Sequence, residues 1–451
     1  MVKDLNYFPL DVESNIYGMT KLEFDDKTNK ILVATLDCRI YCINYNRFKP
    51  QTKEVEFTYI PNGAKIISIG TLKRGPNDFV IGITHSLSPT PPKSASNREL
   101  IAGDSYNNRQ TTYYFNIYAS ESVSPSFDLD YVAQGCQTLR LRYVPYHLYS
   151  TELLSFSSTN SATMEVVRKP IWLLSGGDNN LHAYLEDRPY QSFNEAQLDE
   201  CFPELCDKQK SIALWIDVAN IVKDSSISTG RASVERLIAL GFEDGSVKLY
   251  HSKLNEATNR FDLIRASSFD SYATIIPCVR LFRINSTNHD SILRRRLGQS
   301  GINCDINQDG RFEELNLLIV SSTNSSLIFK DVLNNGLTDK RELPGSQRLD
   351  CVTTATIDDT NIDGCNELLL STHGKELITY QYDRSSGEYV LDDISVLNYP
   401  IFAMTILDLT GDGVKDLIVL LASGILIMQT SSVDLMELCR KRVKAVLSAL
   451  T

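Results

Sequence analysis

The chain has 451 residues, too many for one ordinary hydrophobic core, so the sequence predicts either several domains or one repeat array. Hydrophobic residues make up 42% of the chain, which is enough to fold it throughout. The formal net charge of −11 lacks the basic excess that phosphate backbones and anionic lipid surfaces attract, so nucleic acid is excluded as an expected partner.

No segment of the sequence predicts membrane insertion. The N-terminal MVKDLNYFPLDVES has no apolar core of the length that a signal peptide requires. The longest apolar stretch, LIVLLASGILIM at residues 417–428, is shorter than the roughly twenty residues of a membrane span. We therefore expect a soluble, cytoplasmic protein.

One pattern recurs along the chain: an apolar run, a short polar turn and a second run of alternating apolar and aromatic residues, which is typical of a β-hairpin. Six copies have short turns: KILVATLDCRIYCINYN from Lys30, IWLLSGGDNNLHAYLED from Ile171, LIALGFEDGSVKLYH from Leu237, LNLLIVSSTNSSLIFKD from Leu315, ELLLSTHGKELITYQYD from Glu367 and DLIVLLASGILIMQT from Asp416. A seventh copy, from Phe79 to Ser120, has a turn enlarged by a long insertion.

A further strand-like segment precedes each hairpin. In chain order these segments are NIYGMTKLEF, AKIISIGTL, QTLRLRYV, SIALWIDVANIV, TIIPCVRLF, CVTTATI and IFAMTIL. A strand, a loop, a hairpin and a looser fourth strand make a four-stranded antiparallel sheet, and radial repetition of such sheets is a β-propeller. The sequence therefore predicts an all-β, seven-bladed β-propeller over residues 1–430.

Two segments fall outside this repeat. Residues 85–112 are rich in Ser, Pro and Asn and cannot bury enough apolar surface to order themselves, so we expect a disordered insertion there. Residues 432–451, SVDLMELCRKRVKAVLSALT, place apolar side chains on one face at helical spacing and have Lys and Arg after their first turns. They predict a C-terminal amphipathic α-helix that either packs on the propeller or binds a partner.

Three acidic segments predict loops of the FG-GAP kind, known from integrin-type propellers, between the first and second strands of the last three blades. Each contains a turn-forming Gly and offers oxygen ligands at matching spacing: Asp305, Asn307, Asp309 and Glu313 in blade five, Asp359, Asn361, Asp363 and Glu367 in blade six, and Asp408, Thr410, Asp412 and Asp416 in blade seven. An EF-hand is excluded, because its twelfth position needs a bidentate Glu and these loops have Asn316, Leu370 and Val419 there.

These loops leave two interpretations open. Their oxygens suit a hard cation such as calcium, which would stiffen a blade rather than take part in catalysis. Asp and Asn before Gly also form tight turns without any metal, because their side chains accept hydrogen bonds from nearby backbone amides. Elsewhere the sequence lacks a phosphate-binding glycine loop, a serine nucleophile elbow and a paired-histidine zinc motif, so we expect no required cofactor and no enzyme.

Several stretches spread along the chain resemble the kaptin family: SNIYG at Ser14, FTYIP at Phe57, WLLSGGDNNLHAY at Trp172, LNNGLTDKRELPGS at Leu333 and DGCNELLLSTHGKEL at Asp363. The resemblance implies a non-catalytic scaffold subunit of the KICSTOR complex. That complex holds the GATOR complex at the lysosomal surface and restrains TOR signalling when amino acids or glucose run short. The implied partners are other KICSTOR subunits, especially a second FG-GAP propeller protein, with GATOR contacted indirectly.

Two other function classes stay open at this point. The resemblance also implies an association with actin at lamellipodia and sensory-cell stereocilia, and so an alternative role as a cytoskeletal protein. An enzyme of the propeller lyase or hydrolase type would need a carboxylate or His cluster at the mouth of the channel, for which the sequence offers no candidate by spacing. A soluble, acidic propeller without a reaction centre is most simply a protein-binding surface.

Overall fold

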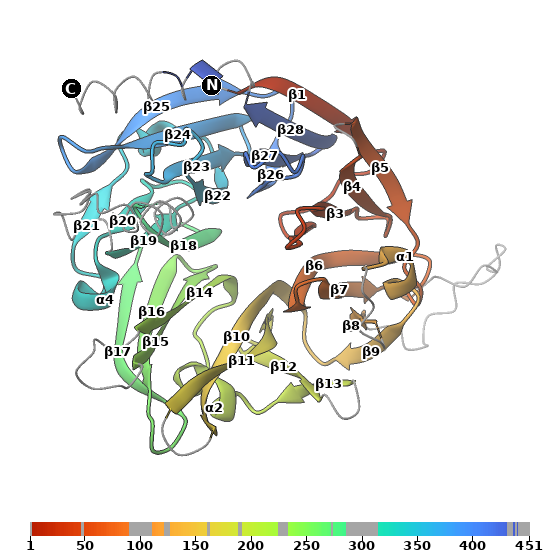
Figure 1. Ribbon diagram of the computed structural model, residues 1–451, viewed down its shortest axis with the longest axis vertical. Coiled ribbons are helices and arrows are strands. Elements are labelled where there is room, and N and C mark those ends of the chain that lie inside the picture. Colours follow the sequence, from red (N-terminus) through yellow and green to blue (C-terminus); the bar gives the residue numbers. More distant parts are fainter. Residues whose placement is uncertain are drawn as a thin grey trace, which may run out of the picture.

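The computed structural model describes residues 2–46, 49–89, 111–120, 127–159, 163–187, 192–223, 233–271, 274–285, 314–430, 436–437 and 440. These residues form seven four-stranded antiparallel sheets arranged in a ring around a central channel (Figure 1). The predicted all-β, seven-bladed propeller is thus confirmed. None of the helices formed by these residues has the length and apolar character that crossing a bilayer requires.

In blades one to six, the four strands follow one another outward from the channel in chain order. Blade one contains β2 (Met19–Leu22), β3 (Lys30–Ala34), β4 (Ile40–Asn46) and β5 (Lys49–Val55); blade two β6 (Ala64–Gly75), β7 (Asp78–Leu87), β8 (Thr112–Tyr118) and β9 (Cys136–Leu141); blade three β10 (Pro145–Thr159), β11 (Thr163–Gly176), β12 (Leu181–Asp187) and β13 (Ser192–Ala196). Blade four contains β14 (Ala213–Lys223), β15 (Ser233–Phe242), β16 (Ser246–Leu254) and β17 (Phe261–Asp270); blade five β18 (Cys278–Arg283), β19 (Leu315–Val320), β20 (Leu327–Phe329) and β21 (Lys340–Glu342); blade six β22 (Val352–Asp358), β23 (Glu367–Thr372), β24 (Glu376–Asp383) and β25 (Glu388–Val396). Short helical turns lie in the connections between strands. α1 (Leu129–Val132) is within blade two and α4 (Val332–Asn335) within blade five, whereas α2 (Leu198–Cys201), η1 (Pro203–Leu205) and η3 (Ser346–Arg348) lie between blades.

Blade seven brings together the two ends of the propeller sequence. Its inner strands are β26 (Ile401–Leu407), β27 (Asp416–Leu421) and β28 (Gly424–Thr430), and its outer strand is the N-terminal β1 (Val2–Pro9). β1 runs antiparallel to β28, with register pairs from Val2↔Thr430 to Pro9↔Gly424. The Tyr7 hydroxyl adds a hydrogen bond of 2.9 Å to the carbonyl of Ser423, 416 positions away in the sequence. Backbone pairing between distant segments therefore closes the ring.

All seven predicted hairpins are present as the second and third strands of a blade. Six of the seven preceding segments overlap the first strand of their blade, but the prediction for QTLRLRYV is wrong. That segment forms β9, which pairs with β8 from Tyr113↔Leu141 to Tyr118↔Cys136 and is the outer strand of blade two. Blade three begins instead with β10, whose second half, LLSFSST, is rich in serine and threonine and so lacks a strong apolar run.

The Ser/Pro-rich insertion is shorter than predicted at both ends. β7 extends to Leu87 and β8 starts at Thr112, and these two residues pair with each other. Residues 90–110, most of the predicted insertion, lie outside the described residues. The predicted C-terminal helix lies largely outside them as well: Met436, Glu437 and Arg440 are helical, and the helix over residues 432–451 stays a prediction.

Apolar side chains are buried between neighbouring blades rather than in one central core. The second strands β19, β23 and β27 are buried along their whole length, because each is covered by a blade on either side. Between blades two and three, for example, Trp172 packs with Phe115 and Tyr184. Gly82 makes room for this contact, since a Cβ there would lie 2.9 Å from side-chain atoms of Leu148 and Phe115. Each blade therefore depends on both of its neighbours for its buried apolar surface.

Candidate functional site

The acidic loop of blade six joins β22 to β23 as a tight turn held by its own carboxylates. Asp359 accepts hydrogen bonds from the backbone N–H groups of Asp363 and Gly364, each at 2.9 Å. Glu367 accepts from the N–H and the hydroxyl of Thr360 at 2.7 and 2.8 Å. Gly364 has a φ of +88°, in the left-handed region that favours glycine. Backbone amides and a hydroxyl therefore satisfy much of the acceptor capacity of these carboxylates.

The same three carboxylates converge on one point. Asp359, Asp363 and Glu367 each present one oxygen, and these oxygens lie within 4.8 Å of one another. Among the described residues, no other group of three or more Asp, Glu, His or Cys side chains lies close enough to share a metal ion. Burial raises the pKa of Glu367 to about 7, and the nearby Asp363 carboxylate adds to the rise. A cation between the carboxylates would offset both effects, because opposite charge favours the ionised form.

Asn361 decides how well this loop fits a cation. Its Nδ2 donates to Glu367 Oε1 at 2.7 Å and to Asp363 Oδ2 at 3.3 Å, so the amide nitrogen lies where a cation would bridge the two carboxylates. Turned by 180°, the amide would present its oxygen to a cation but would lose the hydrogen bond of 2.7 Å that its Oδ1 accepts from the N–H of Asp363. Arg384 donates to the carbonyl of Asp363 at 3.0 Å, and its positive charge disfavours a second cation. The carboxylates offer oxygen ligands, whereas the amide nitrogen and Arg384 oppose a cation, and calcium at Asp359, Asn361, Asp363 and Glu367 stays a prediction.

In the loop of blade seven, each carboxylate accepts hydrogen bonds from backbone N–H groups separately from the others. Asp408 accepts from the N–H groups of Gly411 and Gly413, at 2.8 and 2.9 Å. Asp416 accepts from the N–H of Leu409 at 3.0 Å, and burial raises its pKa to about 6. Asp412 accepts from a backbone N–H of its own loop. These carboxylates form turns, and the described geometry does not gather them into a group like that of blade six.

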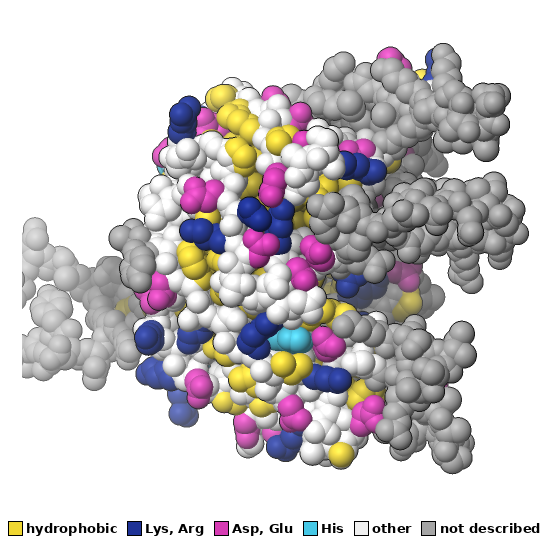
Figure 2. All heavy atoms as spheres, turned by 90° about the vertical axis from the view of Figure 1, so that its left-hand side faces the viewer, with side chains coloured by type: hydrophobic (Ala, Val, Ile, Leu, Met, Phe, Trp, Pro, Cys, Tyr) yellow, Lys and Arg dark blue, Asp and Glu magenta, His cyan; other side chains and the backbone are white. Residues whose placement is uncertain are grey.

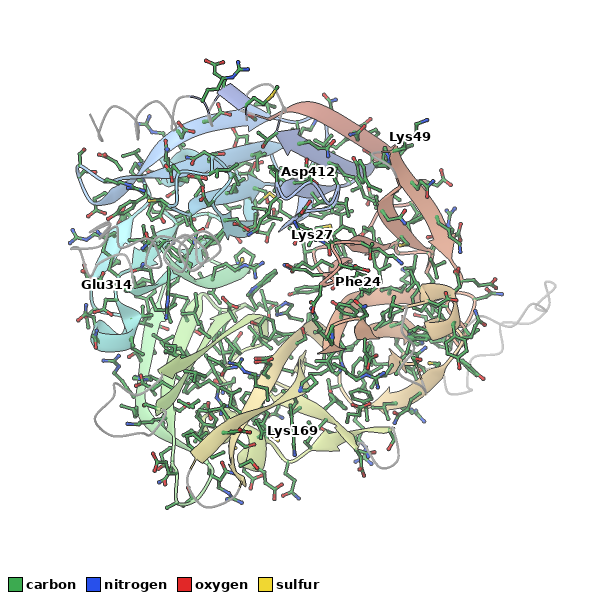
Figure 3. The ribbon with its side chains drawn as sticks, viewed as in Figure 1. Phe24, Lys27, Lys49, Lys169, Glu314 and Asp412 are labelled. Atoms are coloured by element: carbon green, nitrogen blue, oxygen red, sulfur yellow. The ribbon has the colours of Figure 1, made fainter. Side chains whose placement is uncertain are left out.

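A lysine from blade one lies beside this blade-seven loop. Lys27 belongs to the turn between β2 and β3, and a Cβ added to Gly413 would lie 3.7 Å from its Nζ. Figure 3 shows Lys27 and Asp412 on adjoining blades near the channel. Because an ammonium group competes with a metal ion for the same carboxylates, the calcium prediction for Asp408, Thr410, Asp412 and Asp416 gains no support and stays a prediction. The blade-five loop, with Asp305, Asn307, Asp309 and Glu313, lies outside the described residues.

The equivalent turn of blade one, FDDKTN at residues 24–29, was not predicted from the sequence. Asn29 Oδ1 accepts from the N–H of Phe24 at 2.8 Å, and Asn29 Nδ2 donates to the carbonyl of Asp408 at 2.7 Å. This side chain ties blade one to the blade-seven loop. The signal in the sequence was the position of these polar residues, which directly follow the first strand of a blade as the three acidic loops do.

A cluster at the centre of the ring was also not predicted. Tyr17, just before β2, donates its hydroxyl to the carbonyl of Leu214 at 2.6 Å, from blade one across to blade four. His147 of β10 stacks on Trp215 of β14 with ring centroids 4.4 Å apart. The guanidinium of Arg280, on β18, lies 4.7 Å from the centre of the same indole. These contacts connect blades one, three, four and five across the channel.

Two titratable side chains of this cluster accept hydrogen bonds from backbone N–H groups. His147 Nδ1 accepts from the N–H of Ile216 at 3.0 Å, and burial, with a smaller effect of Arg280, lowers the pKa of His147 to about 3. His147 is therefore neutral and fixed as an acceptor near pH 7. Asp217 accepts from the Tyr149 hydroxyl at 3.0 Å and from a backbone N–H of β18 at 2.6 Å, and burial raises its pKa.

A cavity of about 450 Å³ lies beside this cluster, between the first strands of blades four to seven and blade one. Its charged lining consists of Lys21, Asp217, Arg280, Arg283 and Asp358. Asp358 is paired with Lys415 at 2.7 Å, and Arg280 Nε donates to the carbonyl of Ala355 at 3.1 Å. No Ser, His or Cys is among the described residues that line this cavity.

Comparisons with known proteins give a match along nearly the whole chain. A family model described as KICSTOR complex protein kaptin matches residues 2–440. The mouse (Mus musculus) KICSTOR complex protein kaptin is 28% identical over 443 residues, which cover 96% of this chain and 89% of the mouse protein. The matched residues include every strand of all seven blades.

Solved structures give a weaker likeness. U3-55K has a TM-score of 0.47 at 10% identity, covering 95% of this chain and 98% of that one. The RRP9 WD40 repeats have a TM-score of 0.46 at 9% identity, covering 94% and 97%. Saccharomyces cerevisiae Sqt1 has a TM-score of 0.44 at 9% identity, covering 95% and 99%.

Proposed function

Because the chain belongs to the family of the KICSTOR complex protein kaptin, we propose that it is a non-catalytic scaffold subunit of a KICSTOR complex. Its direct neighbours are other KICSTOR subunits, especially a second FG-GAP propeller protein. Through them it helps to hold the GATOR complex at the lysosomal surface and so restrains TOR signalling under amino-acid or glucose limitation. The observation that carries this proposal is the extent of the family match, residues 2–440, which leaves out no blade.

The chemistry of the described polar clusters supports a non-catalytic role. His147 and Asp217 in the channel hold backbone groups of blades four and five, and Arg280 covers an indole and holds a carbonyl of blade six. The carboxylates of the blade-six loop accept bonds from their own turn. Side chains that are committed to holding blades together make a rigid ring, and a rigid ring suits a protein whose task is to present surfaces to partners.

The test is a pull-down of the tagged chain from nutrient-starved cells, followed by mass spectrometry. We expect recovery of a second FG-GAP propeller protein together with further KICSTOR and GATOR subunits. A variant that lacks the closing strand β1 serves as the negative control. Because its ring is open, it should lose all of these partners together. Recovery of actin and its regulators without any of these subunits would contradict the proposal and favour the cytoskeletal alternative, which cosedimentation of the purified chain with actin filaments would then decide.

A structural calcium ion in the blade-six loop is part of this proposal. Asp359, Asn361, Asp363 and Glu367 would hold it, and it would replace the amide nitrogen of Asn361 between the carboxylates. We expect saturating calcium to raise the melting temperature of the purified chain relative to EDTA, because a ligand that binds only the folded state stabilises it. Asp359→Asn should abolish the increase, and Asp408→Asn in blade seven, the control, should leave it intact. An equal response of both variants would contradict the assignment.

A further inference from the structure

Exposed apolar side chains concentrate on the outer rim of blades six and seven. Twelve large hydrophobic side chains are exposed among the described residues, and six of them belong to this apolar rim: Tyr7, Val390, Leu391, Ile394, Val396 and Tyr399. Four of the six are on β25, the outer strand of blade six, where Val396 is 73% exposed. Single exposed apolar residues are common on protein surfaces, whereas a contiguous group usually marks a surface that something covers.

Two stacked tyrosines extend the apolar rim towards blade seven. Tyr7 of β1 and Tyr399, in the connection from β25 to β26, stack with ring centroids 6.4 Å apart. In Figure 2, hydrophobic side chains gather near the top of the face shown, the level at which β25 lies in Figure 1, with acidic side chains beside them. Among the other outer strands, β5 (KPQTKEV) and β21 (KRE) have no exposed large hydrophobic side chain, and β17 has two, Leu263 and Ile264, against four on β25. The apolar rim is therefore a local feature and does not follow from the propeller repeat.

The backbone of β25 disfavours coverage by another β-strand. β25 ends the order β22-β23-β24-β25, so one of its edges has no strand partner within the sheet. Its register with β24 shifts between the pairs Thr379↔Asp393 and Tyr380↔Leu391, which leaves Asp392 as an extra residue in the strand. Such a bulge bends and twists an edge strand, and charged residues at an edge oppose the addition of a further strand. A helix laid across the side chains is compatible with both features.

The charges beside the apolar rim define what kind of helix fits. Asp392 and Asp393 are exposed in the middle of β25, between Leu391 and Ile394. An occupant that also covers the two carboxylates must bring positive charge to them, because covering them without a counter-charge would be costly. The expected occupant is thus an amphipathic helix with Lys and Arg next to its apolar face.

The chain leaves the propeller beside this surface. A cavity of about 410 Å³ between blades six and seven is lined by Asp392, Asp393 and Ser395 of β25 and by Met428 and Thr430 of β28. Thr430 is the last residue of β28 and of the continuous described range 314–430. Whatever follows Thr430 therefore starts next to the two aspartates of the rim, at a high effective concentration.

The sequence that follows has the required chemistry. Residues 432–451 have an apolar face at helical spacing and four basic residues, Arg440, Lys441, Arg442 and Lys444. As a helix these twenty residues would be about 30 Å long, which matches the length of about 30 Å of the nine-residue strand β25. We propose that the apolar rim of blade six is the docking surface for the chain's own residues 432–451, with the basic side chains facing Asp392 and Asp393.

Hydrogen exchange of the full chain tests this proposal without removing any residue. The first variant reverses the charges of the segment by R440E/K441E/R442E/K444E. We expect the amides of residues 388–396 to exchange at least about fivefold faster than in the unmodified chain, because local exchange follows the opening of the covering element. β17, which also exposes two apolar side chains, Leu263 and Ile264, should not change. A control, K49E/K65E/K208E/K210E, reverses four exposed lysines elsewhere and should leave β25 as it was.

A charge swap decides whether the contact is the one described. Adding D392K/D393K to the reversed segment should restore the slow exchange of β25, and D392K/D393K alone should accelerate it. Equal exchange of β25 in all variants would overturn the proposal, and so would failure of the swap to restore protection. Protection that disappears on dilution would also overturn it, since that result would assign the apolar rim to a second copy of the chain.

Discussion

A buried ion pair joins blade four to the connection that precedes it, and its replacement tests how much this contact stabilises the propeller. Arg236 of β15 and Glu204 of η1 are both fully buried and joined by two hydrogen bonds, from Nε at 2.8 Å and from Nη2 at 3.0 Å. The guanidinium also lies between two aromatic rings, 4.3 Å from the centroid of Phe202 and 3.7 Å from that of Phe261. Burial lowers the pKa of Arg236, and the Glu204 carboxylate opposes that effect. This pair attaches the connection between blades three and four to the propeller.

The expected magnitudes follow from the complete burial of both charges. Glu204→Leu leaves the guanidinium without its counter-charge and should destabilise the chain by about 3–5 kcal/mol, as breaking a buried pair generally does. Arg236→Met leaves the carboxylate with only the Ser252 hydroxyl, at 3.0 Å, and should cost a similar amount. The double variant should lose clearly less than the sum of the two, because methionine can fill the space between Phe202 and Phe261 and no unpaired charge remains.

A double-mutant cycle measures this coupling. Urea unfolding followed by tryptophan fluorescence gives the midpoint for the unmodified chain, both single variants and the double variant, at low and high salt. A coupling of at least about 2 kcal/mol between the two sites is expected, since residues in one buried network are strongly non-additive. It should persist at high salt, because a pair without solvent contact is little screened. If the losses of the two single variants were additive, or if high salt removed the coupling free energy, the two side chains would not act as a buried ion pair.

Three further predictions address packing, charge and closure. Gly82→Ala should lower stability by about 1–3 kcal/mol in thermal melts, because a Cβ would lie 2.9 Å from two buried side chains. The control is Gly75→Ala, which should change stability little because the nearest atom to its Cβ is 3.6 Å away. Equal losses of stability in the two variants would contradict the packing argument. The pKa of Glu367 is about 7 in the folded chain against the usual 4.5, so the native state binds its proton more tightly than the unfolded chain. Stability should therefore fall as pH rises between these values in EDTA, by up to about 3 kcal/mol, and Glu367→Gln should remove that fall in urea titrations across the pH range. Deletion of Val2–Pro9 should make blades one and seven the first sites of limited proteolysis, because β28 loses its antiparallel partner, and an unchanged cleavage pattern would show that the ring does not depend on β1.

The blades could be predicted from the sequence because their hairpins are local. In GFEDGSVKLY, for instance, the turn residues and the alternating pattern lie within ten residues of each other, and the structure places the turn between β15 and β16 as expected. Counting such units gives the number of blades. What joins the units is not local: β1 pairs with β28 from the other end of the propeller sequence. No periodic pattern within one segment can reveal that pairing.

The assignment of β9 shows the same limit at shorter range. QTLRLRYV alternates like any first strand, and only its partner decides its position in the ring. Because α1 turns the chain back after β8, β9 runs alongside β8 and completes blade two. β10 then starts blade three with a strand of fifteen residues. Its second half alternates Ser and Thr with apolar residues, of which Leu154 packs against Val234, Leu254 and Phe261 of blade four.

The candidate site divides along the same line between local and distant contacts. Spacing alone located the loops of blades six and seven, and each forms the turn that its Asp and Gly residues favour. The chemistry of each loop depends on side chains from elsewhere: Arg384 lies beside Asp363, and Lys27 of blade one lies beside Gly413. Two loops with nearly the same sequence pattern therefore differ in their fitness for a cation.

The central cluster extends this argument from the loops to the whole ring. Tyr17, His147, Trp215 and Arg280 are separated by more than sixty positions each, and only Tyr17, in SNIYG, belongs to a stretch that carries the family resemblance. They meet because the first strands of all blades converge on one channel, where any polar group must find a partner or remain unpaired in a buried place. In a propeller the inner side chains thus hold the blades together. Side chains on outer strands such as β25 are not needed for this, so they can differ in ways that create a binding surface. A surface that departs from the repeat, as the apolar rim does, is for this physical reason the place to look for function.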